Sequence, residues 1–277
     1  MSGFGALAEN YDGFIVDLWG VVHDGVRLFP GVLECLIKLR AAGKRVVFLS
    51  NAPRRTHGIG QMLASMGVTA DLYEGIMSSG EAVYLGLRDR TDEFAKLGRR
   101  IYHLGPARDR NVFDVVPGYE EAGDPAAADF LLNTGPDDEI GPQNPELYWP
   151  VLRAALRAGL PMICANPDLE VSRDGKLIIC AGFLAEMYKG EGGSVIARGK
   201  PDPAIYVPVM AMLNTARERT LAIGDSLRTD IAGAKAAGID SLWVLSGIHA
   251  LHPDEAATEA AVSGLSPKAI LPGLAWG

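Results

Sequence analysis

The sequence alternates short apolar runs with longer stretches whose apolar residues recur at helical spacing. Phe14–Leu18 and Val46–Leu49 are apolar runs of strand length, and Val32–Leu39 between them has helical spacing behind Pro30. Strands that alternate with helices in this way are typical of a parallel sheet covered by helices. The pattern therefore predicts an α/β fold with a doubly wound, Rossmann-like parallel sheet.

Further elements of the same kind follow on both sides of a long middle segment. A helix is expected up to about Met66, a weaker strand near Leu72, and a new helix at Ser78, which has capping-box spacing to Glu81. The alternation returns towards the C-terminus, with strands over Ser194–Arg198, Thr220–Ile223 and Ser241–Leu245, and helices from Pro203 to about Asn214 and over Thr229–Ala237.

In the middle of the chain the alternation of strands and helices is less regular. Strands are expected over Ile101–Leu104, Phe130–Leu132 and Met162–Ala165, and a helix over Glu146–Ala158, but stretches rich in Gly, Pro and acidic residues interrupt them. The simplest organisation is a core of residues 1–79 and 192–277 that is interrupted by an inserted α/β domain, residues 80–191.

Composition excludes several kinds of partner. Apolar residues make up 48% and charged residues 22% of the chain, as in ordinary globular proteins, and the net charge is −8. Nucleic acids and anionic membranes reward positive charge, so neither is expected as a partner. The N-terminus lacks the basic start and apolar run of a signal peptide, and a cytoplasmic location is expected. The oligomeric state stays open, with a homodimer as one alternative.

Cysteine usage argues against disulfides and zinc. The three cysteines, Cys35, Cys164 and Cys180, cannot pair completely, and none has CxxC spacing. We expect them to be buried as small apolar side chains in a reducing compartment.

Polar residues follow the predicted strands of the core. In parallel sheets, ligands bind beyond the carboxyl ends of the strands, so these residues carry the functional information. A single carboxylate there is often only a helix cap, and a single serine only a turn residue. The order of the whole set is more telling: Asp17, Ser50 with Asn51, Lys200, Asp225, and Asp230 five residues later.

This order of residues resembles the haloacid dehalogenase-like phosphatase superfamily. The similarity is strongest to the NagD-like sugar phosphatases, which carry a large cap between the second and third motifs. The most specific matches are Cys164–Asp168, Gly199–Pro203, Ile223–Asp230 and Leu245–Gly247. The resemblance spans nearly the whole chain and implies a phosphohydrolase.

The resemblance also implies roles for the polar residues. Asp17 would attack phosphorus and form an aspartyl-phosphate, Ser50 would bind a phosphoryl oxygen, and Lys200 would supply positive charge. Mg²⁺ would be the cofactor, because hard oxygen ligands with room for phosphate suit it. Its ligands would be Asp17, the backbone carbonyl of Trp19, Asp225 and Asp230, although Asp230 could instead cap the helix that follows.

One position departs from the family pattern. Most of these phosphatases carry an acid two residues after the nucleophile, where this chain has Trp19. General acid–base catalysis typically contributes about 10²–10⁴ in rate, so its loss predicts slow turnover unless another group substitutes. Asp24 is the expected substitute acid and His23 the second candidate, and the alternative is that both are ordinary loop residues. Trp19 could also exclude water, favour phosphotransfer or stack on a substrate ring.

The inserted domain would close over the site and select a small phosphorylated metabolite, such as a sugar phosphate. Asn51, Asn166 and Asp168 are the expected substrate contacts, although Asn-Pro-Asp is also a good turn sequence. Arg54 and Arg55 could meet an anionic substrate, but solvated helix charges are the commoner case.

Three classes of function remain open from the sequence. The first is a phosphatase. The second, suggested by Trp19, is a catalytically weak sensor that binds a phosphometabolite. The third is a phosphotransferase or dehalogenase on the same fold, and the retained pair Asp225 and Asp230 argues against a metal-free dehalogenase.

Overall fold

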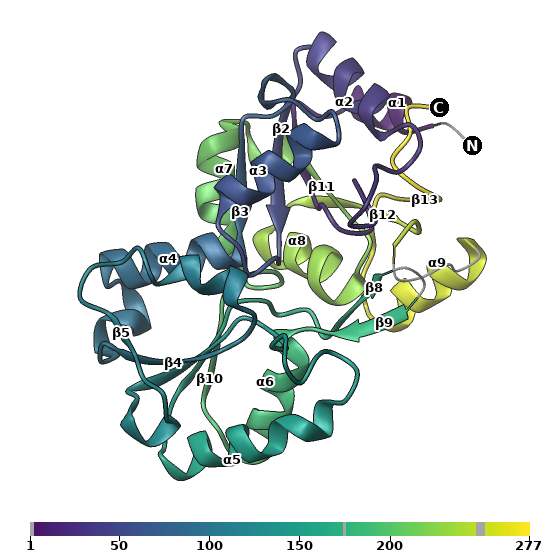
Figure 1. The fold of residues 1–277 in the computed structure, drawn as a ribbon. Helices are drawn as coiled ribbons and strands as arrows, with labels where there is room; N and C mark the ends of the chain where they lie inside the picture. Colours follow the sequence, from purple (N-terminus) through teal and green to yellow (C-terminus); the bar gives the residue numbers. More distant parts are fainter. Residues whose placement is uncertain (1–2, 174–175, 248–252) are drawn as a thin grey trace.

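The computed structural model describes residues 3–173, 176–247 and 253–277, and within them two parallel sheets lie one above the other (Figure 1). The larger sheet has six strands among these residues, in the order β13-β12-β11-β1-β2-β3, and every neighbouring pair is parallel. Its strands are β1 (Gly13–Val16), β2 (Arg45–Ser50), β3 (Gly75–Ser78), β11 (Thr220–Gly224), β12 (Asp240–Val244) and β13 (Ala269–Leu271). The predicted doubly wound sheet is confirmed.

Helices cover both faces of this sheet because its strands are apolar on both sides. Phe14 and Val16 of β1 pack towards one face, and Ile15 packs towards the other. The first face is covered by α1 (Phe4–Ala8), α2 (Val32–Ala41) and α3 (Thr56–Ser65), the second by α7 (Tyr206–Leu213) and α8 (Ala232–Ala237), while α9 (Pro253–Val262) packs beside Trp243.

The second sheet is built from the middle of the chain. Its order is β10-β7-β6-β4-β5, again parallel. The strands are β4 (Arg100–Leu104), β5 (Glu120–Glu121), β6 (Phe130–Asn133), β7 (Met162–Cys164) and β10 (Val195–Ala197). Helix α4 (Ser79–Asp89) packs on one face, and α5 (Trp149–Arg157) and α6 (Ala181–Gly190) pack on the other.

Strand β10 changes the expected domain boundary. A division at residue 191 placed this strand in the core, but β10 pairs with β7, and Val195 lies opposite Met162. The sequence pattern could not reveal this, because an apolar run does not show which sheet it joins. We infer that the inserted unit comprises residues 80–198 and that the chain returns to the core unit (residues 3–79 and 199–277) at Gly199.

Several other elements differ from expectation. Leu72 lies in a 3-10 turn, and the neighbouring strand is β3, because apolar spacing alone does not separate such turns from strands. The helix expected over Thr229–Ala237 begins as a π-helical turn, Leu227–Ile231, before α8. The sequence analysis did not anticipate α1, α6, α9, β13, or the antiparallel hairpin of β8 (Glu170–Arg173) and β9 (Lys176–Ile179). Short 3-10 turns cover Ala70–Leu72, Asp92–Lys96, Ala107–Val112, Pro125–Ala127, Pro145–Tyr148, Pro203–Ile205 and Arg217–Arg219.

The junction between the two units is fixed at the start of α4. The Ser78 hydroxyl accepts a hydrogen bond from the Glu81 amide at 3.0 Å, which confirms the predicted N-cap. The Glu81 carboxylate does not return to Ser78, as a full capping box would require. It accepts instead from the Arg55 guanidinium at 2.7 Å and the Thr56 amide at 3.1 Å. The same acid therefore also ties α3 to α4.

The three cysteines are buried and free, as expected. Within the described residues, no helix has the length and apolar character needed to span a bilayer.

The packing of the inserted unit gives a stability prediction. Phe130 is fully buried between β4 and α4. Replacing Phe130 with Ala should lower the free energy of unfolding by about 3–5 kcal/mol, because the lost apolar contacts leave a cavity. Val115 lies in the same unit, is 57% exposed and supplies the control. Val115→Ala should change the free energy of unfolding by less than about 0.5 kcal/mol. Chemical denaturation measures both, and equal effects would contradict the assigned packing.

Candidate active site

The carboxyl ends of three core strands meet at one edge of the six-stranded sheet. Val16 lies opposite Phe48 of β2 and Ile223 of β11, so the residues that follow these strands are neighbours. Asp17 directly follows β1, and its amide donates to the Ile223 carbonyl at 2.9 Å. Ser50 ends β2 and Asp225 directly follows β11. Parallel register alone thus gathers three of the expected residues.

Lys200 joins them from the loop after β10. Its side chain is 3% exposed, and its ammonium donates to Asp17 Oδ1 and to Asp230 Oδ1, both at 2.6 Å. A third hydrogen bond goes to the Leu49 carbonyl at 3.0 Å. All three ammonium hydrogens therefore have acceptors. The expectation that Lys200 follows a core strand is wrong, since β10 belongs to the inserted sheet, yet the residue reaches the predicted site.

Three carboxylates form a compact, buried group. One oxygen each from Asp17, Asp225 and Asp230 lies within 4.8 Å of the others. Glycines make room for them: a Cβ on Gly20, whose φ is +84°, would lie 2.2 Å from Asp225 Oδ2, and one on Gly224 would lie 2.1 Å from the Asp230 Cβ. Any side chain at these positions would displace the acids.

Burial and ion pairing act against each other on the acid and the amine. Burial raises the pKa of Asp17 to about 7, although Lys200 opposes this shift. Burial alone would lower the pKa of Lys200, but the Asp17 and Asp230 carboxylates outweigh it and raise that pKa. Lys200 therefore stays protonated, and its ammonium contributes one positive charge to the group of carboxylates.

The charges of this group fit a divalent cation. When all three carboxylates are ionised, a single ammonium leaves two excess negative charges in a buried place, which is unfavourable without a counter-ion. Carboxylate oxygens are the ligands that hard divalent cations prefer. Asp17, Asp225 and Asp230 are thus the residues that could hold such an ion. Asp230 is also tied to the protein, because its Oδ2 accepts from the Ser226 amide at 3.1 Å.

Ser50 faces a cavity of about 400 Å³ that opens from the carboxylates towards the inserted unit. Its hydroxyl oxygen accepts from the Ala52 amide at 3.2 Å, so the hydroxyl hydrogen is left for a ligand. Lys200 and the carboxylates line the same end of the cavity. This end can hold an anion between a hydroxyl, an ammonium and a cation.

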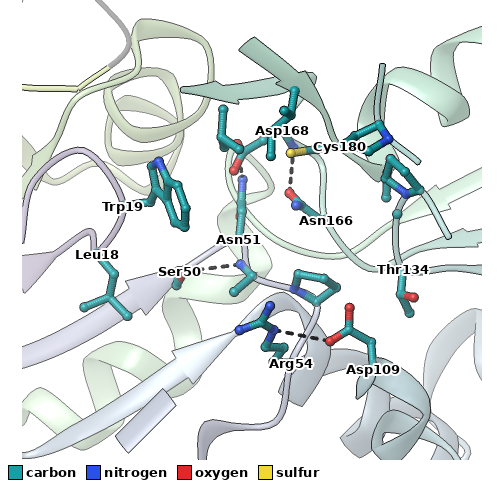
Figure 2. A pocket seen from close by; sticks show the side chains of 18 of the residues that line it. Leu18, Trp19, Ser50, Asn51, Arg54, Asp109, Thr134, Asn166, Asp168 and Cys180 are labelled. Atoms are coloured by element: carbon teal, nitrogen blue, oxygen red, sulfur yellow. Dashed lines mark hydrogen bonds and ion pairs between the residues drawn. The ribbon is translucent and has the colours of Figure 1, made fainter. Parts of the chain in front are cut away.

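Asn51, expected to contact substrate, lines the cavity and also connects three segments of the chain, and Figure 2 shows its contact with Asp168. Its side-chain nitrogen donates to Asp168 Oδ1 at 2.9 Å and to the Lys200 carbonyl at 3.1 Å. Its side-chain oxygen accepts from the Lys200 amide at 2.8 Å. Both backbone groups of Lys200 are therefore held by one amide, and Asn51 acts on the site by fixing the position of that lysine.

Asn166 and Asp168 follow β7 and line the cavity. The Asn166 side-chain oxygen accepts from the Asp168 amide at 3.0 Å, which closes the turn that Asn-Pro-Asp predicted. Burial raises the pKa of the Asp168 carboxyl, while Lys200 and the hydrogen bond from Asn51 oppose the shift. Asp168 thus has a hydrogen-bond partner in the core, Asn51. Because Asp168 also lines the cavity, its contact with substrate stays a prediction.

Trp19 holds the β8–β9 hairpin against the core. Its indole N–H donates to the Ser172 carbonyl in β8 at 3.0 Å, and its ring lines the cavity beside Asp17. A Cβ on Gly25 would lie 2.4 Å from the Trp19 ring, so the following loop wraps closely around it. The residue that replaces the usual acid therefore closes the site from the side of the hairpin.

The structure places Asp24 away from the reacting groups, which corrects the expectation that it is the substitute acid. Its Oδ1 accepts from the Val26 and Arg27 amides, both at 2.9 Å, and it does not line the cavity. These backbone hydrogen bonds, that of Arg27 first, lower the pKa of Asp24, so the carboxyl holds its proton poorly. Its residue type and position suggested an acid, but its local turn uses the carboxylate.

His23, the second candidate, is buried and lines the cavity. Its Nδ1 accepts from the Gly25 amide at 3.0 Å, which places the ring proton on Nε2. That atom has no hydrogen-bond partner among the described residues. Burial lowers the pKa of His23 to about 4, so its ring is a neutral hydrogen-bond donor near pH 7.

The sequence analysis missed residues of the inserted unit that line the cavity. Asp109, in the 3-10 turn Ala107–Val112, forms an ion pair with Arg54 at 3.3 Å (Figure 2). Val171 and Ile178 of the hairpin line another side. No local pattern marks Asp109, because it lies in a stretch rich in Gly, Pro and acidic residues that predicts a loop. Only the tertiary packing buries its side chain. Arg55 is held by Glu81 and stacks on Tyr84, so it is not free to meet a substrate.

Comparisons with known proteins agree with this geometry. A family model described as haloacid dehalogenase-like hydrolase matches residues 14–116, and one described as HAD-hydrolase-like matches residues 197–275. The crystal structure of a haloacid dehalogenase-like hydrolase from Brucella suis 1330 superposes with a TM-score of 0.84 and is 30% identical, covering 99% of both chains.

Curated relatives extend the comparison. The chain is 28% identical to the ribonucleotide monophosphatase NagD of Escherichia coli K12, over 86% of this chain and 88% of that protein. It is 26% identical to the D-glycerol 3-phosphate phosphatase of Mycobacterium tuberculosis, over 88% of this chain but only 65% of that protein's length. A crystal structure of glycerol phosphate phosphatase from that organism, in complex with calcium, has a TM-score of 0.65 at 26% identity, over 88% and 68% of the two chains.

The family models together match more than half of the chain, and the matched ranges include Asp17, Ser50, Lys200, Asp225 and Asp230. The chain belongs to the haloacid dehalogenase-like hydrolase family, in its NagD-like sugar phosphatase branch.

Proposed function

We propose that this chain is a Mg²⁺-dependent phosphomonoester hydrolase that acts on a small phosphorylated metabolite through an aspartyl-phosphate on Asp17. The observation that carries the proposal is the shared ammonium of Lys200, which is 2.6 Å from both Asp17 Oδ1 and Asp230 Oδ1 beside a group of three buried carboxylates. Relatives of the chain are named as phosphatases of small phosphate esters, which supports the same reaction class.

The charges explain why the site needs cations. A phosphate monoester is a dianion, and at about 4 Å with an effective dielectric near 20 each like-charge pair costs about 4 kcal/mol. Lys200 supplies one compensating charge. Asp17, Asp225, Asp230 and the Trp19 carbonyl would hold Mg²⁺, which supplies the rest by electrostatic stabilisation of the phosphoryl group.

The chemical steps use the residues of the cavity. A carboxylate oxygen of Asp17 attacks phosphorus, the bond from phosphorus to the ester oxygen breaks, and the leaving alkoxide takes up a proton. Ser50 would donate its hydroxyl hydrogen to a phosphoryl oxygen and Lys200 would hold Asp17 in place. Water then hydrolyses the aspartyl-phosphate and releases phosphate.

Neither Trp19 nor Asp24 offers an acid that could protonate the leaving group. Trp19 has no proton to transfer, and Asp24 is bound to its own loop. We infer that His23 would hydrogen-bond the leaving oxygen through its neutral Nε2–H, because the residue lines the cavity and that nitrogen has no partner among the described residues. Nε2 is closed to solvent in this structure, so the ring would have to turn towards the cavity to reach the oxygen. This arrangement favours esters with good leaving groups.

The nucleophile gives the first test of this function. Asp17→Asn keeps the size of the side chain but removes the attacking charge, so kcat for p-nitrophenyl phosphate should fall by at least about 10³-fold. Asp24→Asn is the matched control, and it should leave kcat within about twofold because Asp24 contacts only its own loop. If Asp17→Asn kept most of the activity, the assigned nucleophile would be wrong.

Metal dependence can be checked without turnover. Mg²⁺ should raise the melting temperature of the wild-type protein, because an ion that binds only the folded state stabilises it. EDTA should reverse this shift and also abolish hydrolysis. Asp225→Asn should lose both the thermal shift and the activity, whereas Asp240→Asn, an acid outside the cavity, should keep both. A Mg²⁺ shift that survived Asp225→Asn would place the ion elsewhere.

The missing acid gives a prediction of gain. Trp19→Asp should raise turnover of an alkyl phosphate at least about tenfold relative to p-nitrophenyl phosphate, because a poor leaving group needs protonation. Trp19→Asn removes the same indole and the same contact to Ser172 but adds no acid. A similar gain in Trp19→Asn would show that ring removal, and not proton donation, is responsible.

A further inference from the structure

The part of the cavity that the inserted unit lines contains a buried carboxylate that the proposed reaction does not use. Asp109 is 2% exposed and lines the cavity. Its Oδ1 lies 3.3 Å from Arg54 Nε, but the geometry gives that oxygen no hydrogen bond among the described residues. Figure 2 shows the carboxylate turned towards Arg54 and the interior of the cavity.

A buried oxygen without a hydrogen-bond donor is unfavourable, and native structures rarely keep one without a reason. Burial raises the pKa of Asp109 to about 6, although Arg54 opposes the shift. Near pH 7 the carboxylate is therefore mostly charged and can accept a further hydrogen bond. Asp109 Oδ1 is itself closed to solvent, but the residue lines the cavity, so a ligand hydroxyl could hydrogen-bond the carboxylate after a small rotation of the side chain.

The other charges in this part of the cavity leave little attraction for a second anion. Arg108 is paired with Asp138 at 3.0 Å, and Asp137 Oδ1 accepts from the backbone amides of Glu139 and Ile140. With Arg54 paired to Asp109, the two arginines face three carboxylates, so this part of the cavity has one excess negative charge. The lining of the cavity as a whole also includes apolar groups, among them Ile59, Met62, Pro106, Pro136 and Pro142.

We propose that Asp109 determines substrate specificity, by accepting a hydrogen bond from a hydroxyl of the leaving group and by cancelling the charge of Arg54. The site would thus select phosphomonoesters of neutral polyols and reject those whose leaving group carries a second anion. This inference rests on the proposed phosphatase function. Selection would thus come from two effects: the hydrogen bond between Asp109 and a hydroxyl of the leaving group, and repulsion between the excess negative charge and a second anion.

A pair of matched substrates tests the proposal. Glycerol 3-phosphate and 3-phosphoglycerate differ in a terminal hydroxymethyl or carboxylate group, so their ratio of kcat/KM isolates the second charge. The wild-type protein should favour glycerol 3-phosphate at least about tenfold. Asp109→Asn should reduce this ratio at least about tenfold, mainly through KM, because Arg54 is then free to bind the carboxylate.

Controls separate this role from a structural one. Asp114→Asn removes a charge from an exposed ion pair of the inserted unit that does not line the cavity, and it should leave the ratio within about twofold. Turnover of p-nitrophenyl phosphate, which carries neither hydroxyl nor carboxylate, is measured in Asp109→Asn as well, so that a general loss of activity is separated from a change in the substrate ratio. An unchanged substrate ratio in a folded Asp109→Asn protein would overturn the proposal.

Two further outcomes remain decisive. If Asp109→Asn does not fold, Arg54→Gln is used in its place. Discrimination against 3-phosphoglycerate should then rise, because Asp109 has lost the cation that it pairs with. A fall in discrimination would show that Arg54 recognises an anion and would overturn the proposal. If the wild-type protein does not hydrolyse p-nitrophenyl phosphate, the proposed function fails. Calorimetric binding of the two matched esters then still tests Asp109, and equal affinities would contradict its role.

Discussion

The buried ammonium of Lys200 is the contact on which the site depends. It joins Asp17 after β1 to Asp230 after β11, and it hydrogen-bonds the carbonyl of Leu49 in β2. A buried charge is tolerated only when it is paired and hydrogen-bonded, so these acceptors must stay together for the lysine to stay inside. The same requirement brings the nucleophile and the candidate metal ligands to one place. Stability of the site and its electrostatics therefore have the same origin.

The core and the inserted unit are coupled through residues beside this lysine. Asn51 holds both backbone groups of Lys200 and also donates to Asp168, which belongs to the inserted unit. Trp19 donates to Ser172 in the β8–β9 hairpin, so the core also contacts the inserted unit on the other side of the cavity. The same contacts therefore fix both the inserted unit over the cavity and the residues around Asp17. A change in the position of the inserted unit would thus alter the geometry around Asp17.

Trp19 and Asp109 are the two residues on which the proposals about leaving group and substrate depend. The indole at position 19 holds the hairpin through Ser172, and under the proposed function the lack of an acid there would slow the turnover of esters with poor leaving groups. In the part of the cavity that the inserted unit lines, the pairing of Arg54 with Asp109 makes a cationic residue electrically neutral towards a substrate. Arg54 taken by itself suggests an anionic substrate, and the carboxylate beside it reverses that reading.

The sequence by itself determined the α/β alternation, because apolar periodicity is a local property. It also supplied the order of Asp17, Ser50, Lys200, Asp225 and Asp230, which carries the family resemblance and does not depend on how the strands pair. Only the tertiary structure decided that β10 joins the inserted sheet, since strand pairing depends on contacts between distant segments. It also decided the fate of individual side chains. Asp24 binds its own turn, Asn51 holds Lys200, and Asp109 is buried against Arg54. Whether a carboxylate serves as an acid, a cap or a specificity group depends on its burial and its partners, and these are set by packing.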